Sequence, residues 1–357
     1  MSQNKDNYFV TIMAGGVGSR FWPSSTEQRP KQFLDILGVG KSLLRMTFER
    51  FTQIVAVDHI LIVTNKIYFD LVHQELPELP TENILCEPSR NNTAPCVAYT
   101  ALRLLSKNKD AIFVTAPSDH VILKEDKFLE HILDALTMVE RNHCITTLGI
   151  KPTRPDTGYG YIHVEEEIAI GSMQKVVSFK EKPKLEIAQS YLESGKYLWN
   201  AGIFVWKASE LIDAFEMYAP EIISVLAEDT TQYGSAQEQE YVNRVYPNTP
   251  SISVDYAILE KSDNVYTIPV EIGWSDLGTW NSLHDYLDKD ENNCVTIGSN
   301  TLLIDTNNSI IRSDSNKTVV IKGLHNYIVV DEKDALLIYP KNDEQEIKNV
   351  VNSINEK

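Results

Sequence analysis

Residues 8–25, YFVTIMAGGVGSRFWPSS, are the stretch from which the fold of this sequence can be inferred. The apolar run 8–13 is typical of a buried β-strand, and it leads directly into Gly15, Gly16 and Gly18. Glycines at a strand end let backbone N–H groups approach an oligophosphate without obstruction by a Cβ atom. The stretch therefore predicts a phosphate-binding loop that follows the first strand of an α/β sheet.

The residues after these glycines carry the positive charge that such a loop needs. Within residues 14–31, Arg20, Arg29 and Lys31 stand against one acid, Glu27, although the 357-residue chain has a formal net charge of −17. An acidic protein of this kind repels nucleic-acid backbones, so we do not expect a nucleic-acid partner. The local excess of cations makes this segment the candidate phosphate site.

Two well-known phosphate-binding motifs do not fit the segment. A Rossmann GxGxxG motif that starts at Gly16 would need glycine where Phe21 stands. A Walker A motif that ends at Lys41-Ser42 would need glycine where Asp35 stands. The glycine loop is therefore of another kind.

Strand-like and helix-like runs alternate through the first half of the chain. We expect strands at 8–13, 59–64, 83–88, 111–117 and 145–150, and helices at 41–55, 66–75, 93–106 and 126–141. Further strands are expected at 160–166, 175–183 and 197–208, with a helix at 184–194 and mostly helical structure over 208–262. This order predicts an α/β class, Rossmann-like domain with a mixed, mainly parallel sheet.

The texture changes beyond residue 290. Six short apolar runs between 293 and 341 are separated by Asn, Asp, Ser and Gly, and a closing helix is expected near 343–353. Evenly spaced short strands of this kind predict a small C-terminal β domain resembling a β-helix. We place the boundary in DKDENN, which gives domains 1–288 and 289–357.

The cysteines and the N-terminal sequence indicate the compartment. Four widely spaced cysteines form no CxxC pair, which favours reduced thiols, and no HxH or HExxH zinc motif is present. The first residues contain no apolar run of signal-peptide length, and no stretch approaches a membrane span. We therefore expect a cytoplasmic protein without a membrane partner.

Two aspartates are candidate metal ligands. Asp119 follows the predicted strand 111–117, and Asp276 lies in GWSDLGTW before a predicted helix. Mg²⁺ binds one or two carboxylates together with substrate phosphate oxygens, so this pair would suit it. The alternative for each aspartate is an N-cap of the helix that follows it.

Nine motifs, taken together, resemble one family, the sugar-1-phosphate nucleotidyltransferases of the GDP-mannose pyrophosphorylase (mannose-1-phosphate guanylyltransferase) type. They occur in the family's order as far as residue 280: MAGGVGSRFWPSS, RPKQF, EPSRNNTAP, PSDH, TGYGYI, FKEKP, WNAGIF, SVDYAILEK and GWSDLGTW. The resemblance covers essentially the whole chain and implies GTP + α-D-mannose 1-phosphate → GDP-mannose + diphosphate, with Mg²⁺. It also implies the single-activity form, without the isomerase domain that many relatives carry.

The resemblance assigns catalytic and metal-binding roles. Arg20 would hold the leaving diphosphate, Lys31 would neutralise charge at the α-phosphate, and Asp119 and Asp276 would hold the metal. The resemblance also implies that Gly15, Gly16 and Gly18 cradle the phosphates. A sugar-phosphate oxygen would attack the α-phosphorus in line, a reaction that depends on positioning and charge neutralisation.

The resemblance places the base at EPSRNNTAP, residues 87–95. Glu87 is the candidate acceptor for the two adjacent guanine N–H donors, with Asn92 and Thr93 shaping the loop. The alternative is that this segment is only a capping turn before a helix. Arg90 and Asn91 stand where the commonest form, EPxGRNTAP, has glycine and arginine, so the role of the motif arginine does not transfer directly.

For the sugar, the resemblance points to four later motifs. The implied sugar-phosphate-binding residues are Gly158, Tyr159, Glu181, Lys182, Asn200 and Asp255. Carboxylates grip vicinal hydroxyls, and Lys182 would contact the sugar phosphate, unless it is only a solvated lysine at a strand end.

Two other functions stay open at this point. One is another sugar-1-phosphate nucleotidyltransferase, with a different sugar or a different nucleoside triphosphate. The other is a catalytically silent regulatory subunit that binds GDP-mannose, although Arg20, Lys31, Asp119 and Asp276 are all present. The oligomeric state is also open, and a homodimer is compatible with the sequence.

Overall fold

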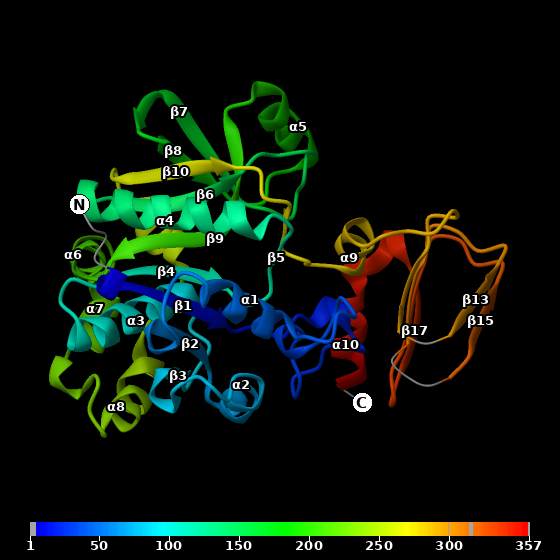
Figure 1. Ribbon diagram of the computed structural model, residues 1–357, viewed down its shortest axis with the longest axis horizontal. Coiled ribbons are helices and arrows are strands. Elements are labelled where there is room, and N and C mark those ends of the chain that lie inside the picture. The colour runs from blue at the N-terminus through cyan, green and yellow to red at the C-terminus, as the bar shows by residue number, and fades with distance from the viewer. Residues whose placement is uncertain (1–4, 299, 314–316, 356–357) are drawn as a thin grey trace. The chain divides into compact units, whose positions relative to one another are not determined.

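The computed structural model describes residues 5–298, 300–313 and 317–355, and the remaining residues of the expected domains lie outside this description. The chain divides into two compact units (Figure 1). Unit 1 contains Met1–Gly15, Phe48–Pro117 and Ile122–Trp274, and unit 2 contains Gly16–Thr47, Ser118–Val121 and Ser275–Lys357. Helix α1 (Leu43–Phe51) and the short strands β5 (Val121–Ile122) and β11 (Trp274–Ser275) fall where the chain passes from one unit to the other.

Unit 1 is built on a nine-stranded sheet in the order β3-β2-β1-β4-β9-β6-β10-β8-β7. Its strands are β1 (Tyr8–Ala14), β2 (Ile60–Asn65), β3 (Ile84–Glu87), β4 (Ile112–Pro117), β6 (Ile145–Ile150), β7 (Tyr161–Ile170), β8 (Met173–Lys180), β9 (Tyr197–Lys207) and β10 (Val265–Val270). The pairs among β1, β2, β3 and β4 are parallel, whereas β9 is antiparallel to both β4 and β6. The mixed sheet expected from the sequence is therefore confirmed.

The parallel register brings two predicted site segments to one edge of this sheet. Ala14 pairs with Thr64, and Asn65 pairs with Glu87, so Gly15 and Glu87 follow strands that end at the same edge. Ligands of open α/β sheets bind beyond the carboxyl ends of parallel strands. The edge that carries Gly15 and Glu87 is that end.

Helices cover both faces of the sheet, because the central strands carry apolar side chains on both faces. Helix α4 (Glu125–Asn142) lies in front of the sheet in Figure 1 and contacts β4, β6, β9 and β10. The other face packs on α3 (Thr93–Lys107), α6 (Ala208–Tyr218) and α7 (Pro220–Leu226). The remaining helices of unit 1 are α2 (Phe69–Glu75), α5 (Leu185–Ser194), α8 (Glu238–Val245) and a π-helical turn, Asp255–Leu259.

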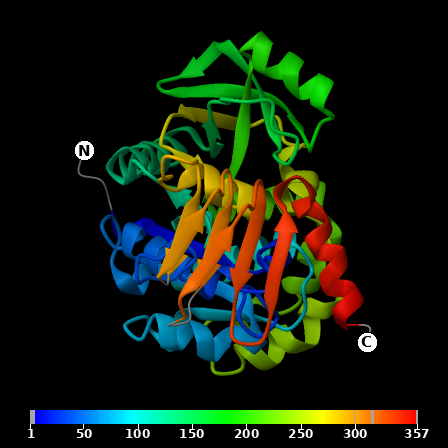
Figure 2. The same cartoon turned by 90° about the vertical axis from the view of Figure 1, so that its right-hand side faces the viewer.

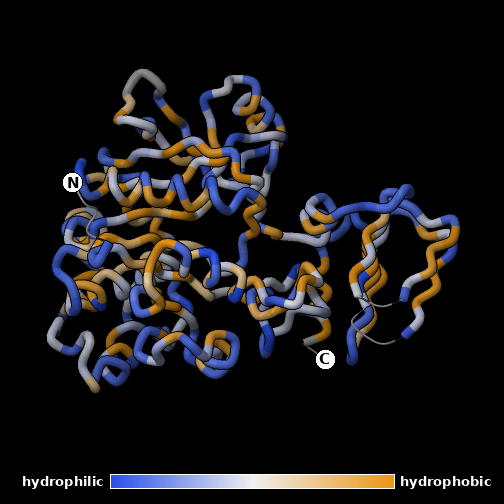
Figure 3. The backbone as a smooth tube through the Cα atoms, in the orientation of Figure 1, coloured by the Kyte–Doolittle hydropathy of each residue, from blue (hydrophilic) through white to orange (hydrophobic). Residues whose placement is uncertain are grey.

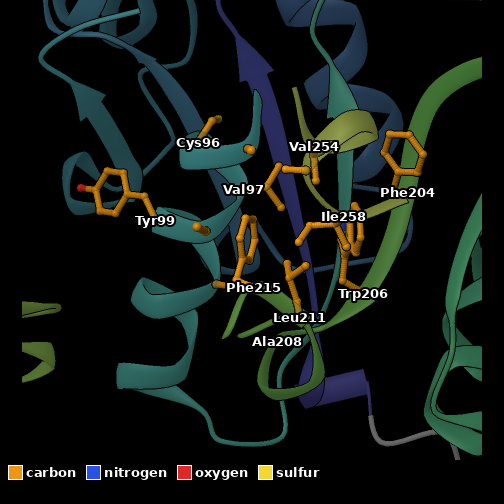
Figure 4. Close-up of a cluster of buried hydrophobic side chains, with 14 of the residues drawn as sticks. Cys96, Val97, Tyr99, Phe204, Trp206, Ala208, Leu211, Phe215, Val254 and Ile258 are labelled. Atoms are coloured by element: carbon orange, nitrogen blue, oxygen red, sulfur yellow. The ribbon is translucent and has the colours of Figure 1, made fainter. Parts of the chain in front are cut away.

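Hydrophobic residues follow the central strands (Figure 3). Figure 4 shows where α3, β9, α6 and the π-helical turn meet, with Val97, Trp206, Leu211 and Ile258 in one cluster. The apolar positions that predicted the helix at 93–106 are the buried positions of α3, so that prediction is confirmed.

The C-terminal part of unit 2 is a β-solenoid, as the sequence predicted. Its elements are β12 (Val295–Gly298), β13 (Thr301–Ile304), β14 (Ile310–Ser313), β15 (Val319–Lys322), β16 (Tyr327–Asp331), β17 (Leu336–Pro340), α9 (Trp280–Tyr286) and α10 (Ile347–Asn355). The sheet β12-β14-β16 and the pair β13-β15 are parallel, and β17 closes antiparallel to β16 (Figure 2).

Asparagines stack at one corner of the solenoid. Asn293 donates to Asn308 at 2.7 Å, and Asn308 donates to Asn326 at 3.0 Å. All three adopt positive φ (60°, 47° and 64°), a conformation that asparagine tolerates better than most residues. The asparagine before each of these runs is therefore the turn residue that lets the chain start the next coil.

The packing divides the chain differently from the expected sequential boundary near 288. Residues 16–47 belong with the C-terminal segment because Phe21, Ile36 and Leu37 share one core with Trp280 and Ile310. A compact unit can thus be formed from three separate stretches of sequence, which local composition does not reveal. No helix in the described part of the chain is long and apolar enough to cross a membrane.

Candidate active site

Lys31 is the centre of the predicted phosphate site in unit 2. It opens the short helix η3 (Lys31–Phe33) and is only 4% exposed. Its ammonium contacts Asp119 Oδ2 at 2.8 Å and donates to the carbonyls of Asp276 at 2.9 Å and Leu277 at 3.0 Å. The three acceptors match the three N–H donors of a lysine, so one buried cation brings together the motifs RPKQF, PSDH and GWSDLGTW.

Asp119 is the ionised partner of this lysine. Burial opposes ionisation, but the charges of Lys31 and His120 outweigh it, so the pKa of Asp119 lies below its usual range. The His120 ring lies 4.0 Å from the other carboxylate oxygen. The alternative of a helix cap is wrong for Asp119, because α4 begins after Lys124 and takes no side-chain cap.

Asp276 is not a helix cap either. Thr279 caps α9 and forms a capping box with Ser282, whereas Asp276 Oδ1 accepts a hydrogen bond from Gly278 N at 2.9 Å. The expectation that Asp276 could serve as the N-cap is therefore wrong, because the helix begins at Trp280. The carboxylate instead holds the turn whose carbonyls bind Lys31.

The glycine loop is shaped by the residues of the RPKQF motif. Gly18 has φ +68°, and a Cβ atom there would come within 2.6 Å of Lys31 Cβ, so no larger residue fits. The buried Gln32 donates to Gly16 O at 3.3 Å, and Lys31 N donates to Val17 O at 3.3 Å. Gly15 and Gly16 face open space, as a loop that receives a phosphate requires. Arg20 follows in η2 (Ser19–Phe21) with an exposed side chain.

Asp119 and Asp276 are the predicted ligands of Mg²⁺, and this role stays a prediction. Lys31 joins the Asp119 carboxylate to the main-chain carbonyl of Asp276, and the Asp276 carboxylate accepts a hydrogen bond from Gly278 N. Among the described residues, no three acidic, histidine or cysteine side chains gather into a protein-only metal cage. Mg²⁺ binds one or two carboxylates when substrate phosphates complete its coordination, so Asp119 and Asp276 would suffice in number.

Glu87 ends β3 in unit 1, and its carboxylate is turned toward the interior. One oxygen accepts a hydrogen bond from the hydroxyl of Tyr246, and the thiol of Cys96 lies against it. Burial raises the pKa of Glu87 to about 7, although both neighbours oppose the shift. Its bidentate role toward guanine stays a prediction, and it would have to share this carboxylate with Tyr246.

The loop after Glu87 caps α3. Asn92 has φ 67°, and its side chain accepts a hydrogen bond from Thr93 N at 2.8 Å. Thr93 Oγ1 in turn accepts from Val254 N at 2.9 Å. The capping turn that the sequence left as an alternative is therefore present, and it does not exclude contact with a base.

A cavity of about 340 Å³ in unit 1 gathers most of the predicted sugar residues. Its lining includes Glu181, Lys182, Asn200 and Asp255, together with Asn92 of the base loop. Asn200 donates to Asp255 Oδ1 at 2.9 Å, and its own Oδ1 accepts from Gly202 N at 2.9 Å. Burial raises the pKa of Asp255, Asn200 opposes the shift, and the charge of Glu181 adds to it.

Two predicted sugar residues are not among the lining of this cavity. The buried ring of Tyr159 packs edge-on against Trp199 and against Trp274, and the ring centroids are 5.1 Å apart in each pair. Gly158 N donates a hydrogen bond to Asp156 Oδ1 at 2.8 Å. The next residues of the same motif, Gly160 and Tyr161, line the cavity instead. The exposed Lys182 adopts φ 39° and pairs with Glu181.

Sequence reasoning left out several residues that the structure places in contact with the site. Gln32 holds the glycine loop, and His120 lies beside Asp119. Cys96 and Tyr246 contact Glu87. Gln32 and His120 lie inside the quoted motifs, so the motifs themselves were the available signal, whereas Cys96 directly follows EPSRNNTAP and Tyr246 lies outside every motif.

Two family models match this chain. The family model described as nucleotidyl transferase matches residues 10–293. The chain belongs to the nucleotidyl transferase family. A second model, described as a MannoseP isomerase/GMP-like beta-helix domain, matches residues 299–354.

Relatives of this nucleotidyl transferase have consistent descriptions. A mannose-1-phosphate guanylyltransferase of Salmonella montevideo is 36% identical over 356 residues, with 96% of this chain and 73% of the relative covered. One of Escherichia coli is 32% identical over 350 residues, covering 95% of this chain and 74% of the relative. A Thermus thermophilus crystal structure, described as a mannose-1-phosphate geranyltransferase, superposes with a TM-score of 0.89 at 27% identity and covers 98% of this chain and 99% of its own. The resemblance seen in the nine motifs is confirmed.

Proposed function

We propose that this nucleotidyl transferase is a mannose-1-phosphate guanylyltransferase, which converts GTP and α-D-mannose 1-phosphate to GDP-mannose and diphosphate. The observation that carries the proposal is the buried Lys31, held between Asp119 and the Asp276 turn beside the glycine loop. The choice of guanine and mannose is supported by the nine motifs and by relatives that bear this name.

The chain's own residues would act chiefly by position and charge. Gly15, Gly16 and Gly18 would present backbone N–H groups to the triphosphate, and the exposed Arg20 would pair with the leaving diphosphate. Lys31 would stabilise the charge that develops at the α-phosphate as the sugar-phosphate oxygen attacks it. No covalent enzyme intermediate is required, because in-line attack transfers the nucleotidyl group in one step.

The aspartates would hold Mg²⁺, which supplies charge neutralisation at the phosphates when it is bound. Asp119 is ionised well below neutral pH, as a cation ligand must be, because Lys31 lowers its pKa. Lys31 occupies the position between the two aspartate segments and keeps them together before substrate arrives.

Recognition of the two organic groups would fall to unit 1. Glu87 and the 92–93 turn would face the base, and Asp255, Asn200 and Glu181 would bind sugar hydroxyls in the 340 Å³ cavity. We also propose a cytoplasmic location, since all four cysteines are free thiols, as reducing compartments maintain them.

The test is an assay of diphosphate release over a matrix of nucleoside triphosphates and sugar 1-phosphates. GTP with mannose 1-phosphate should give the highest kcat/KM. A faster reaction with UTP and glucose 1-phosphate would assign the chain to another specificity within the family. Tight binding of GDP-mannose without turnover of any pair would instead make it a regulatory subunit.

A further inference from the structure

The predicted base loop, residues 87–93, is tied to a distant segment of the same unit, residues 246–254. The Asn91 amide nitrogen lies 3.1 Å from Tyr246 O, 2.9 Å from Thr249 O and 2.9 Å from Thr249 Oγ1, so its two hydrogens are shared among three acceptors. The Tyr246 hydroxyl in turn donates a hydrogen bond from the segment to Glu87 of the loop. Both ends of the base loop are therefore held by one short segment.

The acceptors of these bonds are buried, which gives the contacts weight. Tyr246 is fully buried and Thr249 is 6% exposed, so their carbonyls have no ready exchange with water. Tyr246 O also accepts from Thr249 N at 3.0 Å and from Thr249 Oγ1 at 2.8 Å, so it keeps donors without Asn91. The cost of removing Asn91 therefore falls on the buried Thr249 O, because a buried carbonyl that loses its donor costs more than the bond itself contributes. Asn91 stands where the commonest family motif has arginine, so this amide is a feature of the present chain rather than of the motif.

The same segment continues into the predicted sugar cavity. Ala94 N donates to Ile252 O at 3.1 Å, and Val254 N donates to Thr93 Oγ1 at 2.9 Å, at the start of the π-helical turn. Asp255 is the first residue of that turn and accepts a hydrogen bond from Asn200. Val254 and Ile258 pack beside Val97 in the core and hold the turn in place (Figure 4). The base loop and the cavity thus share one support.

We propose that residues 246–254 form a clamp that positions the base loop against the nucleotide, through Tyr246 on the clamp and Asn91 on the loop as positioning residues. This inference rests on the proposed function for the identity of the base. Tyr246 orients the Glu87 carboxylate, and Asn91 fixes the backbone between Glu87 and the 92–93 turn. Neither side chain needs to touch the substrate itself.

The pH dependence offers a readout that a purely structural role would not change. Glu87 faces Tyr246 from the 246–254 segment, Cys96 from α3 and Cys86 on its own strand. The Tyr246 hydroxyl favours the ionised carboxylate. Tyr246→Phe should therefore raise the pKa of Glu87. As the pH is lowered, nucleotide binding by this variant should begin to weaken at a higher pH than binding by the wild type.

The experiment measures nucleotide affinity by titration calorimetry and kinetics for Tyr246→Phe and Asn91→Ala, each compared with Tyr233→Phe. Tyr233 is the matched control, because its buried hydroxyl donates to Leu226 O at 2.7 Å in the same core rather than to the base loop. We expect each clamp variant to lose about tenfold in GTP affinity, the scale of one well-placed hydrogen bond. Discrimination between GTP and ITP, which lacks the guanine amino group, should shrink in parallel.

Melting temperatures separate folding from positioning. Clamp variants that match the Tyr233→Phe melting temperature yet lose affinity and show the shifted pH profile support the clamp. Variants that keep GTP affinity and GTP/ITP discrimination within twofold of the control overturn it. If the wild type prefers another nucleotide, the proposed function fails, and loss of affinity for that nucleotide in the same variants still supports the clamp.

Discussion

Two partly buried aspartates, one in each unit, differ in the direction of their pKa shifts. The pKa of Asp119 is lowered because Lys31 and His120 outweigh the effect of burial, whereas burial raises the pKa of Asp255, whose direct partner is the neutral Asn200. Charge compensation thus keeps Asp119 ionised, as its proposed role beside phosphates requires. A neutral partner leaves Asp255 suited to exchange hydrogen bonds with hydroxyls. The direction of the pKa shift of an aspartate thus depends on its neighbour, a charged lysine for Asp119 and a neutral asparagine for Asp255.

Removal of the compensating lysine should have the largest effect on this contrast. Lys31→Ala leaves Asp119 without the cation that offsets burial, and we expect kcat to fall by a factor of about 10² or more. Steady-state kinetics with GTP and mannose 1-phosphate measure this loss, and a melting curve checks that the variant folds. If only the GTP KM rises, Lys31 acts in ground-state binding instead.

Asp276→Asn removes charge from the same cluster while it preserves the local turn. Asparagine can still accept from Gly278 N, and the Thr279 cap of α9 is untouched, so the melting temperature should stay near the wild-type value. Turnover should fall by about 10²-fold, with a much higher Mg²⁺ requirement.

The double variant sharpens this prediction. If Asp119 and Asp276 share one ion, Asp119→Asn combined with Asp276→Asn should cost little more than either change alone. Normal turnover and normal Mg²⁺ dependence in Asp276→Asn would show that Asp276 only stabilises the turn that binds Lys31. The shared-metal account would then fail.

Glu87→Gln tests the base end with a smaller expected effect. An amide places a donor against one guanine N–H, which should cost about 1–3 kcal/mol of discrimination between GTP and ATP. The ratio of kcat/KM values for the two nucleotides measures it. An unchanged ratio would move base recognition to the backbone or to Asn92.

The smallest effect concerns pH in the wild type. Because burial raises the pKa of Glu87 to about 7, the carboxylate is protonated below that pH and ionised above it. If the ionised form accepts the guanine N–H groups, kcat/KM for GTP should rise about twofold from pH 7 to pH 8 and fall at lower pH. Glu87→Gln should lose this pH dependence of kcat/KM. If the variant retains it, another group is responsible for it.

The elements of unit 1 could be predicted because their signals are local. The strand at 8–13 and the helix at 93–106 follow from hydrophobic periodicity within a few residues, and the structure places β1 and α3 there. The motifs likewise identified Lys31 and Asp119 as candidates.

The long-range partners could not be predicted in the same way. Lys31 binds carbonyls 245 and 246 residues away, and Tyr246 reaches Glu87 across 159 residues. Backbone carbonyls leave no mark in the sequence, and Tyr246 lies in no motif. The helix cap at Thr279 rather than Asp276 was missed because both residue types cap well, and only the helix start decides between them.

The most direct test compares Asp119→Asn with Asp255→Asn under identical conditions, with kcat, the KM for mannose 1-phosphate and the Mg²⁺ requirement measured for both. Asp119→Asn should lower kcat by about 10²-fold and raise the Mg²⁺ requirement while the sugar-phosphate KM stays near the wild-type value. Asp255→Asn should raise the sugar-phosphate KM by about tenfold and leave the Mg²⁺ requirement unchanged. If the two variants show the same kinetic signature, the division between a phosphate end at Lys31 and a sugar end at Asn200 is contradicted.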